Sequence, residues 1–207
     1  MKSLCHYDFP KNNRVVFDGD EVRRDVIAGR HGLDYLTNSL VELQMNQSAN
    51  KKKVYRPEMH FTLGNHEQRV DRYNELKGLV DLEKEIRYQG FKVHPFLKPI
   101  EIEGVHFVHY AYNAMSGKPI GGTAEYRLNK LKLSFVQGHE QNFKYAQEYL
   151  NDGRKISALV GGSCYLHDEE YKGFQGNNHF RGCFKLHNVH DGMYDLEQVS
   201  VERLLGK

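Results

Sequence analysis

The stretch at residues 59–70, "MHFTLGNHEQRV", decides how the rest of the chain is interpreted. Its first half alternates apolar and polar residues, as a half-buried β-strand does. A glycine, a carboxamide, an imidazole and a carboxylate follow at once, in "GNHE" at 64–67. Because ligand sites of open α/β sheets form at the ends of strands, this element predicts a functional site rather than a mere turn.

Two other apolar segments end in a comparable way. "VHFV" at 105–108 is followed by His109, and "KLSFV" at 132–136 is followed two residues later by Gly138 and His139. The plain alternatives are a strand histidine paired with its neighbours and a loop histidine with no task. Taken with Asn65, however, the imidazoles form a donor set that suits Mn²⁺, Fe²⁺ or Zn²⁺.

The composition is that of a globular chain. It has 207 residues, of which 39% are hydrophobic and 27% charged, and a formal net charge of +2. The sequence has no uncharged apolar run long enough to predict a membrane span. The N-terminal "MKSLCHYDFPKNN" has no apolar signal region. Three cysteines without a CxxC pair argue against a disulfide framework, so a cytoplasmic protein is expected.

The periodicity of the chain predicts a mixed α/β fold. Strands are expected at 59–63, 91–96, 132–136 and 155–166, and hairpins at 100–112 and 181–201, with turns at Glu103-Gly104 and Asp191-Gly192. Helices are expected at 20–45, 75–90 and 125–131. The first helix carries its apolar residues at a spacing near 3.6, at Val22, Val26, Ile27, Leu33, Leu36, Leu40 and Leu43. For Lys51–Lys53 a solvated loop is favoured over a nucleic-acid contact.

The motifs resemble those of the calcineurin-like metallophosphoesterase superfamily. "GNHE" matches its third motif, "FVHY" its fourth through His109, and "GHEQ" at 138–141 the first half of its fifth, with Gln141 where a second histidine usually stands. The stretches at 54–69, 93–110 and 161–182 look most like members encoded by bacteriophages.

The resemblance implies a single phosphoesterase domain over 1–207, a β-sandwich flanked by helices in αββα layers. It implies Asn65, His109 and His139 as ligands of one metal ion, normally one of two, with Mn²⁺ favoured over Fe²⁺ or Zn²⁺. It places His66 over the phosphate as a catalytic general acid. The implied activity is hydrolysis of a phosphate ester, of nucleotide or nucleic-acid type, in the host cytoplasm if a phage encodes the chain.

Two expected motifs are not found as such. No D-x-H precedes "GNHE". Asp20 after Gly19 is either the bridging metal ligand of the second motif or an acidic residue at a helix start. Arg23 stands at the position where that motif has an oxygen ligand. The expectation is therefore that the first βαβ portion is missing, leaving one metal ion or none. The alternatives are an inactive scaffold and assembly with a separately encoded N-terminal fragment.

A further polar cluster occurs in "YLHDEEYKGFQGNNHF" at 165–180, with Asp168, Glu169, Asn178 and His179. Substrate binding by His179 or Arg181 is one interpretation. A structural loop is the preferred one.

Overall fold

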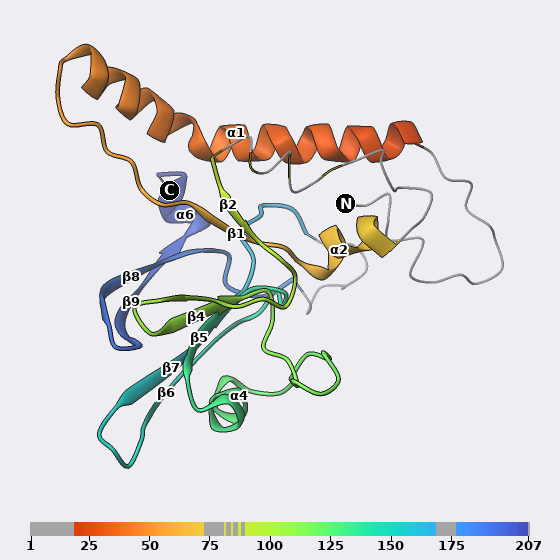
Figure 1. The fold of residues 1–207 in the computed structure, drawn as a ribbon, viewed down its shortest axis with the longest axis vertical. Helices are drawn as coiled ribbons and strands as arrows, with labels where there is room; N and C mark the ends of the chain where they lie inside the picture. Colours follow the sequence, from red (N-terminus) through yellow and green to blue (C-terminus); the bar gives the residue numbers. More distant parts are fainter. Residues whose placement is uncertain are drawn as a thin grey trace. The chain divides into compact units, whose positions relative to one another are not determined.

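The computed structural model describes residues 19–72, 90–168 and 177–206, together with Asp81, Lys84 and Arg87. The chain divides into two compact units, Met1–Phe96 and Leu97–Lys207, which are described separately (Figure 1). Both combine helices with strands, so the predicted α/β class is confirmed at that level. The single domain, the αββα sandwich and the missing first portion stay predictions.

The first unit opens with the 31-residue helix α1, Gly19–Ala49, which extends four residues past the predicted end. Its sheltered side is a stripe of half-buried or buried residues spaced alternately by four and three: Val26, Arg30, Leu33, Thr37, Leu40, Gln44 and Gln47. The last two glutamines bind the backbone of Tyr55, through Gln44 Nε2 to its carbonyl and Gln47 Oε1 from its N–H, each at 2.8 Å. Side-chain amides thus take the place of apolar residues where the chain turns back.

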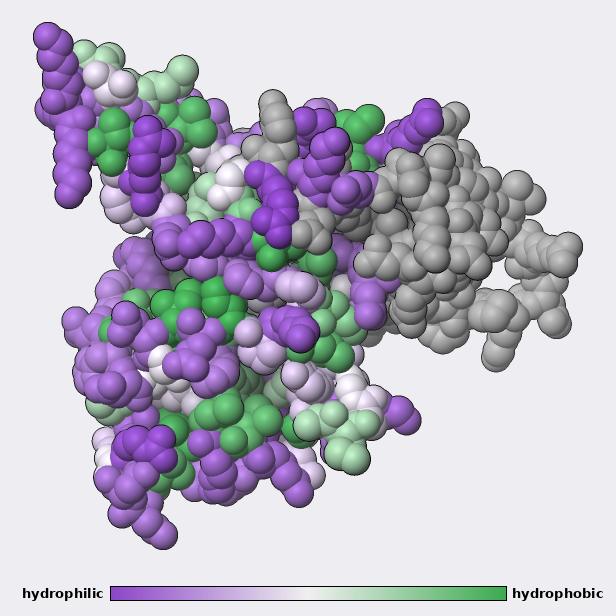
Figure 2. All heavy atoms as spheres, viewed as in Figure 1, coloured by the Kyte–Doolittle hydropathy of each residue, from purple (hydrophilic) through white to green (hydrophobic). Residues whose placement is uncertain are grey.

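The predicted apolar face of α1 is only partly sheltered. Ile27, Leu36 and Leu43 are 52%, 71% and 45% exposed. Figure 2 shows hydrophobic side chains at the surface of the C-terminal half of this helix, among hydrophilic ones. The 3.6-residue spacing therefore predicts the helix correctly but not which of its residues are buried. Lys51, Lys52 and Lys53 beyond the helix are all exposed, as expected for a solvated loop.

Two short parallel strands follow in the first unit, β1 (His60–Thr62) and β2 (Lys92–His94), with Thr62 opposite His94. The helix α2, Asn65–Arg72, begins three residues after β1. The predicted helix at 75–90 lies largely outside the described residues, although Lys84 and Arg87 have helical backbone. A β-strand followed by a helix and a parallel strand is thus the frame that holds the "GNHE" element.

The second unit is built on a five-stranded sheet with the order β3-β4-β5-β7-β6. Strands β4, β5 and β7 run parallel to one another, while the edge strands β3 and β6 are antiparallel to their neighbours. The strands are β3 (Ile100–Ile102), β4 (Val105–Val108), β5 (Ser134–Gln137), β6 (Phe143–Tyr149) and β7 (Lys155–Gly161). The sequence did not predict β6, and the strand predicted at 155–166 ends at Gly161.

One face of this sheet packs against α4, Ala124–Leu131, which Thr123 caps by accepting a hydrogen bond from the Tyr126 N–H at 3.2 Å. The shared core consists of Ala111, Ala124, Leu128, Phe135, Ala146, Ile156 and Ala158. Residues 143 and 145 point to the opposite face, because side chains alternate along a strand. This alternation gives the sheet two apolar faces.

The opposite face is covered by the hairpin of β8 (Gly182–His190) and β9 (Met193–Ser200), which α6 (Val201–Leu204) follows. The ring of Phe184 stacks on Phe143 with centroids 5.4 Å apart, and Tyr194 lies 6.3 Å from Tyr145. Helix α4, the sheet and the hairpin therefore form three layers in this unit. The sequence did not predict α6.

Both predicted hairpin turns are confirmed. Glu103 and Gly104 have φ values of 49° and 79°, and Asp191 and Gly192 have 48° and 78°, as type I′ turns require. The two turns touch, since the Gly192 N–H donates to the Glu103 carbonyl at 2.8 Å. A Cβ on Gly104 would come within 2.5 Å of the Gly192 nitrogen.

This contact predicts that Gly104→Ala is far more damaging than the matched change Gly153→Ala. Gly153 has a similar positive φ of 85° but nothing within 4 Å of an added Cβ, so it isolates the backbone strain. The clash at Gly104 should add about 1–3 kcal/mol of destabilisation. Urea unfolding of the two variants measures the difference, and equal losses would show that the two turns do not touch.

Among the residues that the structure describes, no helix is both long enough and apolar enough to cross a membrane.

Candidate functional site

His109 and His139 lie together beyond the carboxyl ends of two inner strands of the five-stranded sheet. They follow β4 and β5, which are adjacent and parallel, so both chain segments leave the sheet on the same side. His109 Nε2 and His139 Nδ1 are 3.1 Å apart, and the Tyr110 ring lies 4.9 Å from the ring of His139. The structure thus brings together two of the residues that the sequence singles out. Whether they ligate a metal stays a prediction.

The backbone at His139 is strained. Its φ is +66°, and the Glu140 N–H donates to the Gly138 carbonyl at 2.8 Å. A hydrogen bond that skips one residue, around a positive φ, is the mark of the γ-turn, a rare and strained turn. Such strain costs on the order of 1–3 kcal/mol, persists only where the surroundings impose it, and gathers at functional sites.

The surroundings of His139 favour its neutral form. Partial burial lowers the pKa of its imidazole; the Glu140 carboxylate opposes this shift and the Arg127 guanidinium adds to it. Neutral imidazole is the form that binds metal ions. One of its nitrogens faces His109, so the pair is either a hydrogen bond or, with a cation between, two ligands of that cation.

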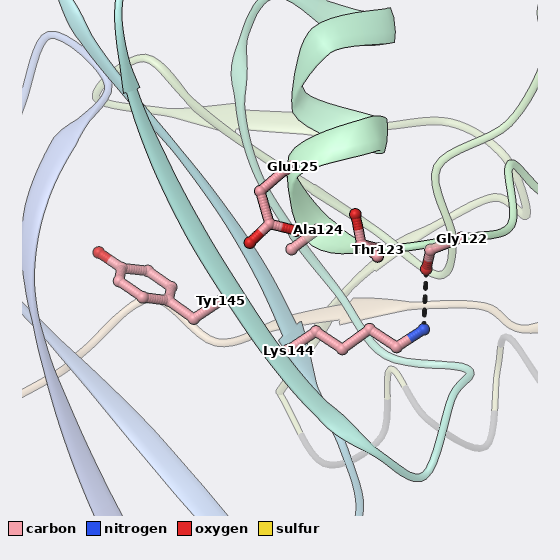
Figure 3. Close-up of a pocket in the computed structure, with 6 residues that line it drawn as sticks. All are labelled: Gly122, Thr123, Ala124, Glu125, Lys144 and Tyr145. Atoms are coloured by element: carbon pink, nitrogen blue, oxygen red, sulfur yellow. Dashed lines mark hydrogen bonds between the residues drawn. The ribbon is translucent and has the colours of Figure 1, made fainter.

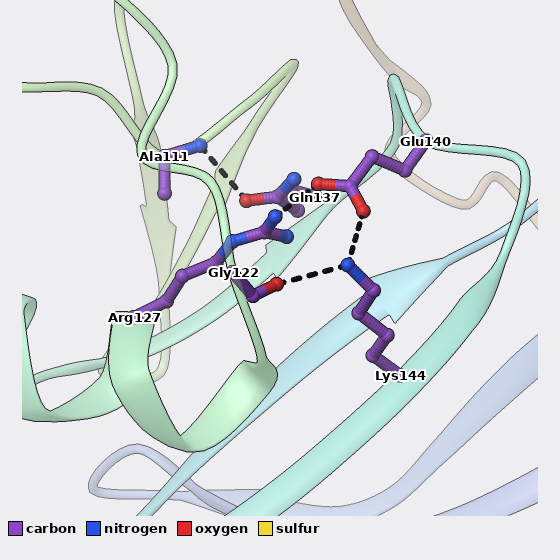
Figure 4. Close-up of polar contacts among 6 residues, drawn as sticks. All are labelled: Ala111, Gly122, Arg127, Gln137, Glu140 and Lys144. Carbon is purple, nitrogen blue, oxygen red and sulfur yellow. Dashed lines mark hydrogen bonds and ion pairs between the residues drawn. The ribbon is translucent and has the colours of Figure 1, made fainter.

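An ion-pair network is centred on Glu140, the residue that follows His139 (Figure 4). The Glu140 carboxylate binds Arg127 Nη2 through one oxygen and Lys144 Nζ, at 2.6 Å, through the other. Lys144 also donates to the Gly122 carbonyl at 2.9 Å. Burial raises the pKa of Glu140, but hydrogen bonds from Lys144 and Arg127 outweigh this and hold the pKa below its usual value.

Asn65 and His66 occupy the first turn of α2 in the other unit. Gly64 precedes this helix, and its N–H donates to the Glu67 carboxylate at 2.8 Å, while its carbonyl accepts from the Gln68 N–H at 3.0 Å. This is the return half of a capping box. "GNHE" is therefore the start of a helix. The carboxylate of Glu67 has a structural task there, and Asn65 and His66 are presented just beyond the end of β1.

The sequence did not single out His94, which ends β2 beside this helix start. Its carbonyl accepts from the Leu63 N–H at 3.0 Å, and its Nε2 lies 2.9 Å from His60 Nδ1. His60 Nε2 in turn faces the Glu58 carboxylate at 3.4 Å. Only knowledge that the two strands are paired could have revealed this chain of a carboxylate and two imidazoles.

The His60–His94 contact predicts an acid-sensitive β1–β2 pair. Burial lowers the pKa of His94, and the nearby charges of His60, Lys92 and Arg87 act in the same direction. A lowered folded-state value means that the unfolded chain binds the proton better. Stability is therefore complete above the ordinary value of 6.5 and is lost as the pH falls from there toward the lowered value.

Amide hydrogen exchange of Leu63, followed against pH, measures this loss. After correction for the intrinsic pH dependence of exchange, protection should fall below neutrality in the parent chain and change less in His94→Gln. Equal pH profiles in the two chains would contradict it.

The structure describes the other predicted metal ligands, Asp20 and Asn65, only in part. The backbone of Asp20 lies in the first turn of α1, as the helix-start interpretation expects, and its side chain lies outside the described residues. Within the described ranges, no three His, Cys, Asp or Glu side chains group so that they could hold a metal ion. Asn65 belongs to the first unit and the His109–His139 pair to the second.

The late polar cluster has a structural arrangement. The His179 Nε2 and the Ser163 hydroxyl are 2.9 Å apart. The Arg181 guanidinium is engaged on several sides: with the Leu166 carbonyl at 3.0 Å, the Asn177 carbonyl at 3.3 Å, the Asp168 carboxylate, and the ring of Tyr165 at 5.3 Å. Glu169 lies outside the described residues. These contacts support the structural interpretation of Arg181, because its guanidinium donors link the segment 166–168 to the carbonyl of Asn177.

An open depression of about 500 Å³ lies at the start of α4 (Figure 3). It is lined by Gly122, Thr123, Ala124, Glu125, Lys144 and Tyr145. Its one ammonium, from Lys144, already binds Glu140 and Gly122, and its carboxylate from Glu125 sits in the first turn of the helix. Because those groups are occupied, we assign the candidate site to the imidazole pair and not to this depression.

Comparison with known proteins adds no relative: no family model, no curated protein and no solved structure matches this chain. The likeness to the metallophosphoesterase superfamily accordingly rests on "GNHE", His109 and His139, and it stays a prediction from those motifs.

Proposed function

We propose that this chain is a metal-dependent phosphoesterase, with His109 and His139 as two of its metal ligands. The observation that carries the proposal is the convergence of these imidazoles, to 3.1 Å, from the ends of two adjacent parallel strands. A strained γ-turn at His139 supports it further, since strain of this kind gathers at functional sites.

The donor set of the pair suits a borderline divalent cation such as Mn²⁺, Fe²⁺ or Zn²⁺. Both donors are imidazole nitrogens, and burial favours the neutral form of His139. Adjacent donors of an ion with bonds of about 2.1 Å lie about 3 Å apart, which is close to the separation found here. The motif resemblance implies the amide oxygen of Asn65 as a further ligand.

The remaining roles are those that the motif resemblance implies. When bound, the metal would polarise the phosphoryl group and lower the pKa of the attacking water. His66 would donate a proton to the leaving oxygen, a task that imidazole performs near neutral pH. The substrate class we propose is a phosphodiester of nucleotide or nucleic-acid type.

Metal binding of the purified chain tests the proposal. Mn²⁺ titration, with the free ion followed by its electron paramagnetic resonance signal, should show binding that His109→Ala and His139→Ala each abolish. His190→Ala is the matched control, because His190 is 58% exposed at the end of β8. Hydrolysis of bis-p-nitrophenyl phosphate should depend on the same ion. Binding that survives both substitutions would refute the ligand assignment.

A second candidate is a scaffold of the same fold without catalysis, and Gln141 in place of the usual histidine favours it. It predicts neither Mn²⁺ binding nor hydrolysis. A third, assembly with a separately encoded N-terminal fragment, predicts that activity appears only when that fragment is added. The same two assays, run with and without that fragment, therefore separate all three.

A further inference from the structure

Arg127 is a buried cation in the second unit, with a side chain 1% exposed. Its Nη2 binds Glu140, but its Nε and Nη1 are buried without a hydrogen-bond partner among the described residues. Burying a charge in this way is unfavourable, and apolar residues of similar volume usually stabilise a core at least as well. The fold of α4 against the sheet therefore does not by itself explain an arginine here.

The partner of Arg127 lies in the strained turn. Glu140 directly follows His139 and supplies the N–H that closes the γ-turn onto Gly138. Its carboxylate is held from two elements, by Arg127 of α4 and by Lys144 of β6. A turn that is unfavourable by itself thus has its closing residue fixed on both sides.

The segment that carries His109 is held by a residue of β5, the strand that leads to His139. The side-chain oxygen of Gln137, which is 2% exposed, accepts the Ala111 N–H at 2.9 Å. This bond ties the segment two residues after His109 to the strand end two residues before His139 (Figure 4). Both histidine-bearing segments are therefore anchored by buried polar side chains, Gln137 of β5 and Arg127 of α4.

We propose that Arg127 is a positioning residue for the imidazole pair. Through Glu140 it holds His139 in the strained conformation in which Nδ1 meets His109. As far as metal binding is concerned, this inference rests on the proposed function; the geometry of the metal-free pair does not depend on it.

The positive charge of Arg127 has the opposite effect on cation binding from positioning, and this difference makes the inference testable. A guanidinium near His139 repels a bound cation, so a charge-only role predicts that Arg127→Met binds Mn²⁺ more tightly and that Arg127→Lys changes nothing. A positioning role predicts that both variants weaken binding by about 10- to 100-fold, as loss of outer-sphere partners of a metal site does. Lysine keeps the charge but lacks the planar fork of arginine.

The experiment compares the full chain with Arg127→Met, Arg127→Lys and the control Arg154→Met. Arg154 forms an exposed pair with Asp152 in the turn before β7, so its loss should have no effect on the site. The metal-free readout is the imidazole ¹⁵N spectrum, in which the His109–His139 hydrogen bond should be lost in both Arg127 variants and kept in the control.

The outcomes are distinguishable. If the parent chain binds no Mn²⁺, the proposed function fails, and the ¹⁵N spectrum alone decides the inference. If Arg127→Met does not fold, as judged by circular dichroism, Arg127→Lys decides it. Retention of the imidazole hydrogen bond, or Mn²⁺ binding as tight as in the parent chain, would overturn the positioning role.

Discussion

Replacing Phe135 with alanine is expected to lower the free energy of unfolding by about 3–5 kcal/mol. Phe135 is 1% exposed in the middle of β5 and belongs to the core between the sheet and α4. Several of its neighbours in that core are alanines, at 111, 124, 146 and 158. Alanine side chains are too short to fill the vacated volume, so most of the cavity should persist.

Urea unfolding followed by circular dichroism measures this loss. Phe135→Leu keeps most of the volume and should cost less than about 1.5 kcal/mol. Tyr149→Ala, at a site on β6 that is 74% exposed, should change the free energy of unfolding by less than about 0.5 kcal/mol. A small effect of Phe135→Ala would mean that the cluster around α4 is not the core of the second unit.

Replacing His66 with alanine is expected to lower the Mn²⁺-dependent hydrolysis of bis-p-nitrophenyl phosphate by about 10²- to 10⁴-fold. The reason is the loss of the group that we propose to protonate the leaving oxygen. His66 lies in the first turn of α2, and the capping contacts there use Glu67 and the backbone of Gly64. The substitution should therefore remove the acid without removing the helix start.

Two comparisons make this result specific. His66→Ala should leave Mn²⁺ affinity unchanged, whereas His139→Ala should remove it, since only the second is a proposed ligand. Glu67→Ala tests the capping role, because it removes the acceptor of the Gly64 N–H and should weaken the helix start while leaving the chemical step in place. A rate in His66→Ala equal to that of the parent chain would remove His66 from the mechanism.

Local signals in the sequence predicted much of the fold. The hairpin turns at 103–104 and 191–192 followed from the glycine that each contains, and both occur at those positions. Helix α1 followed from periodicity, and β1, β5 and α4 from short segments with clear boundaries. Strand β6 was missed because "FKYAQEY" contains no continuous apolar run and keeps no strict alternation beyond Tyr145. Its burial depends on α4 and β8–β9 rather than on its own hydropathy.

The candidate site could be predicted only in part for a related reason. The residues that follow strands were visible, and the pairing of β4 with β5 brings two of them together. What holds them in place was not visible: Arg127, Glu140 and Gln137 come from a helix, a loop and a strand. Their contacts form only when these elements pack, so no spacing along the chain reports them. The same holds for His60 and His94, which are 34 residues apart.

The sheltered stripe of α1 advances by 3.5 residues on average, from Val26 to Gln47, whereas an α-helix turns once every 3.6. The stripe therefore drifts around the helix by about 20° per heptad, in the left-handed sense. A straight segment laid parallel to the axis could cover only part of it. Whatever packs along the whole of α1 must cross it at an angle of about 20° or wind around it as in a coiled coil.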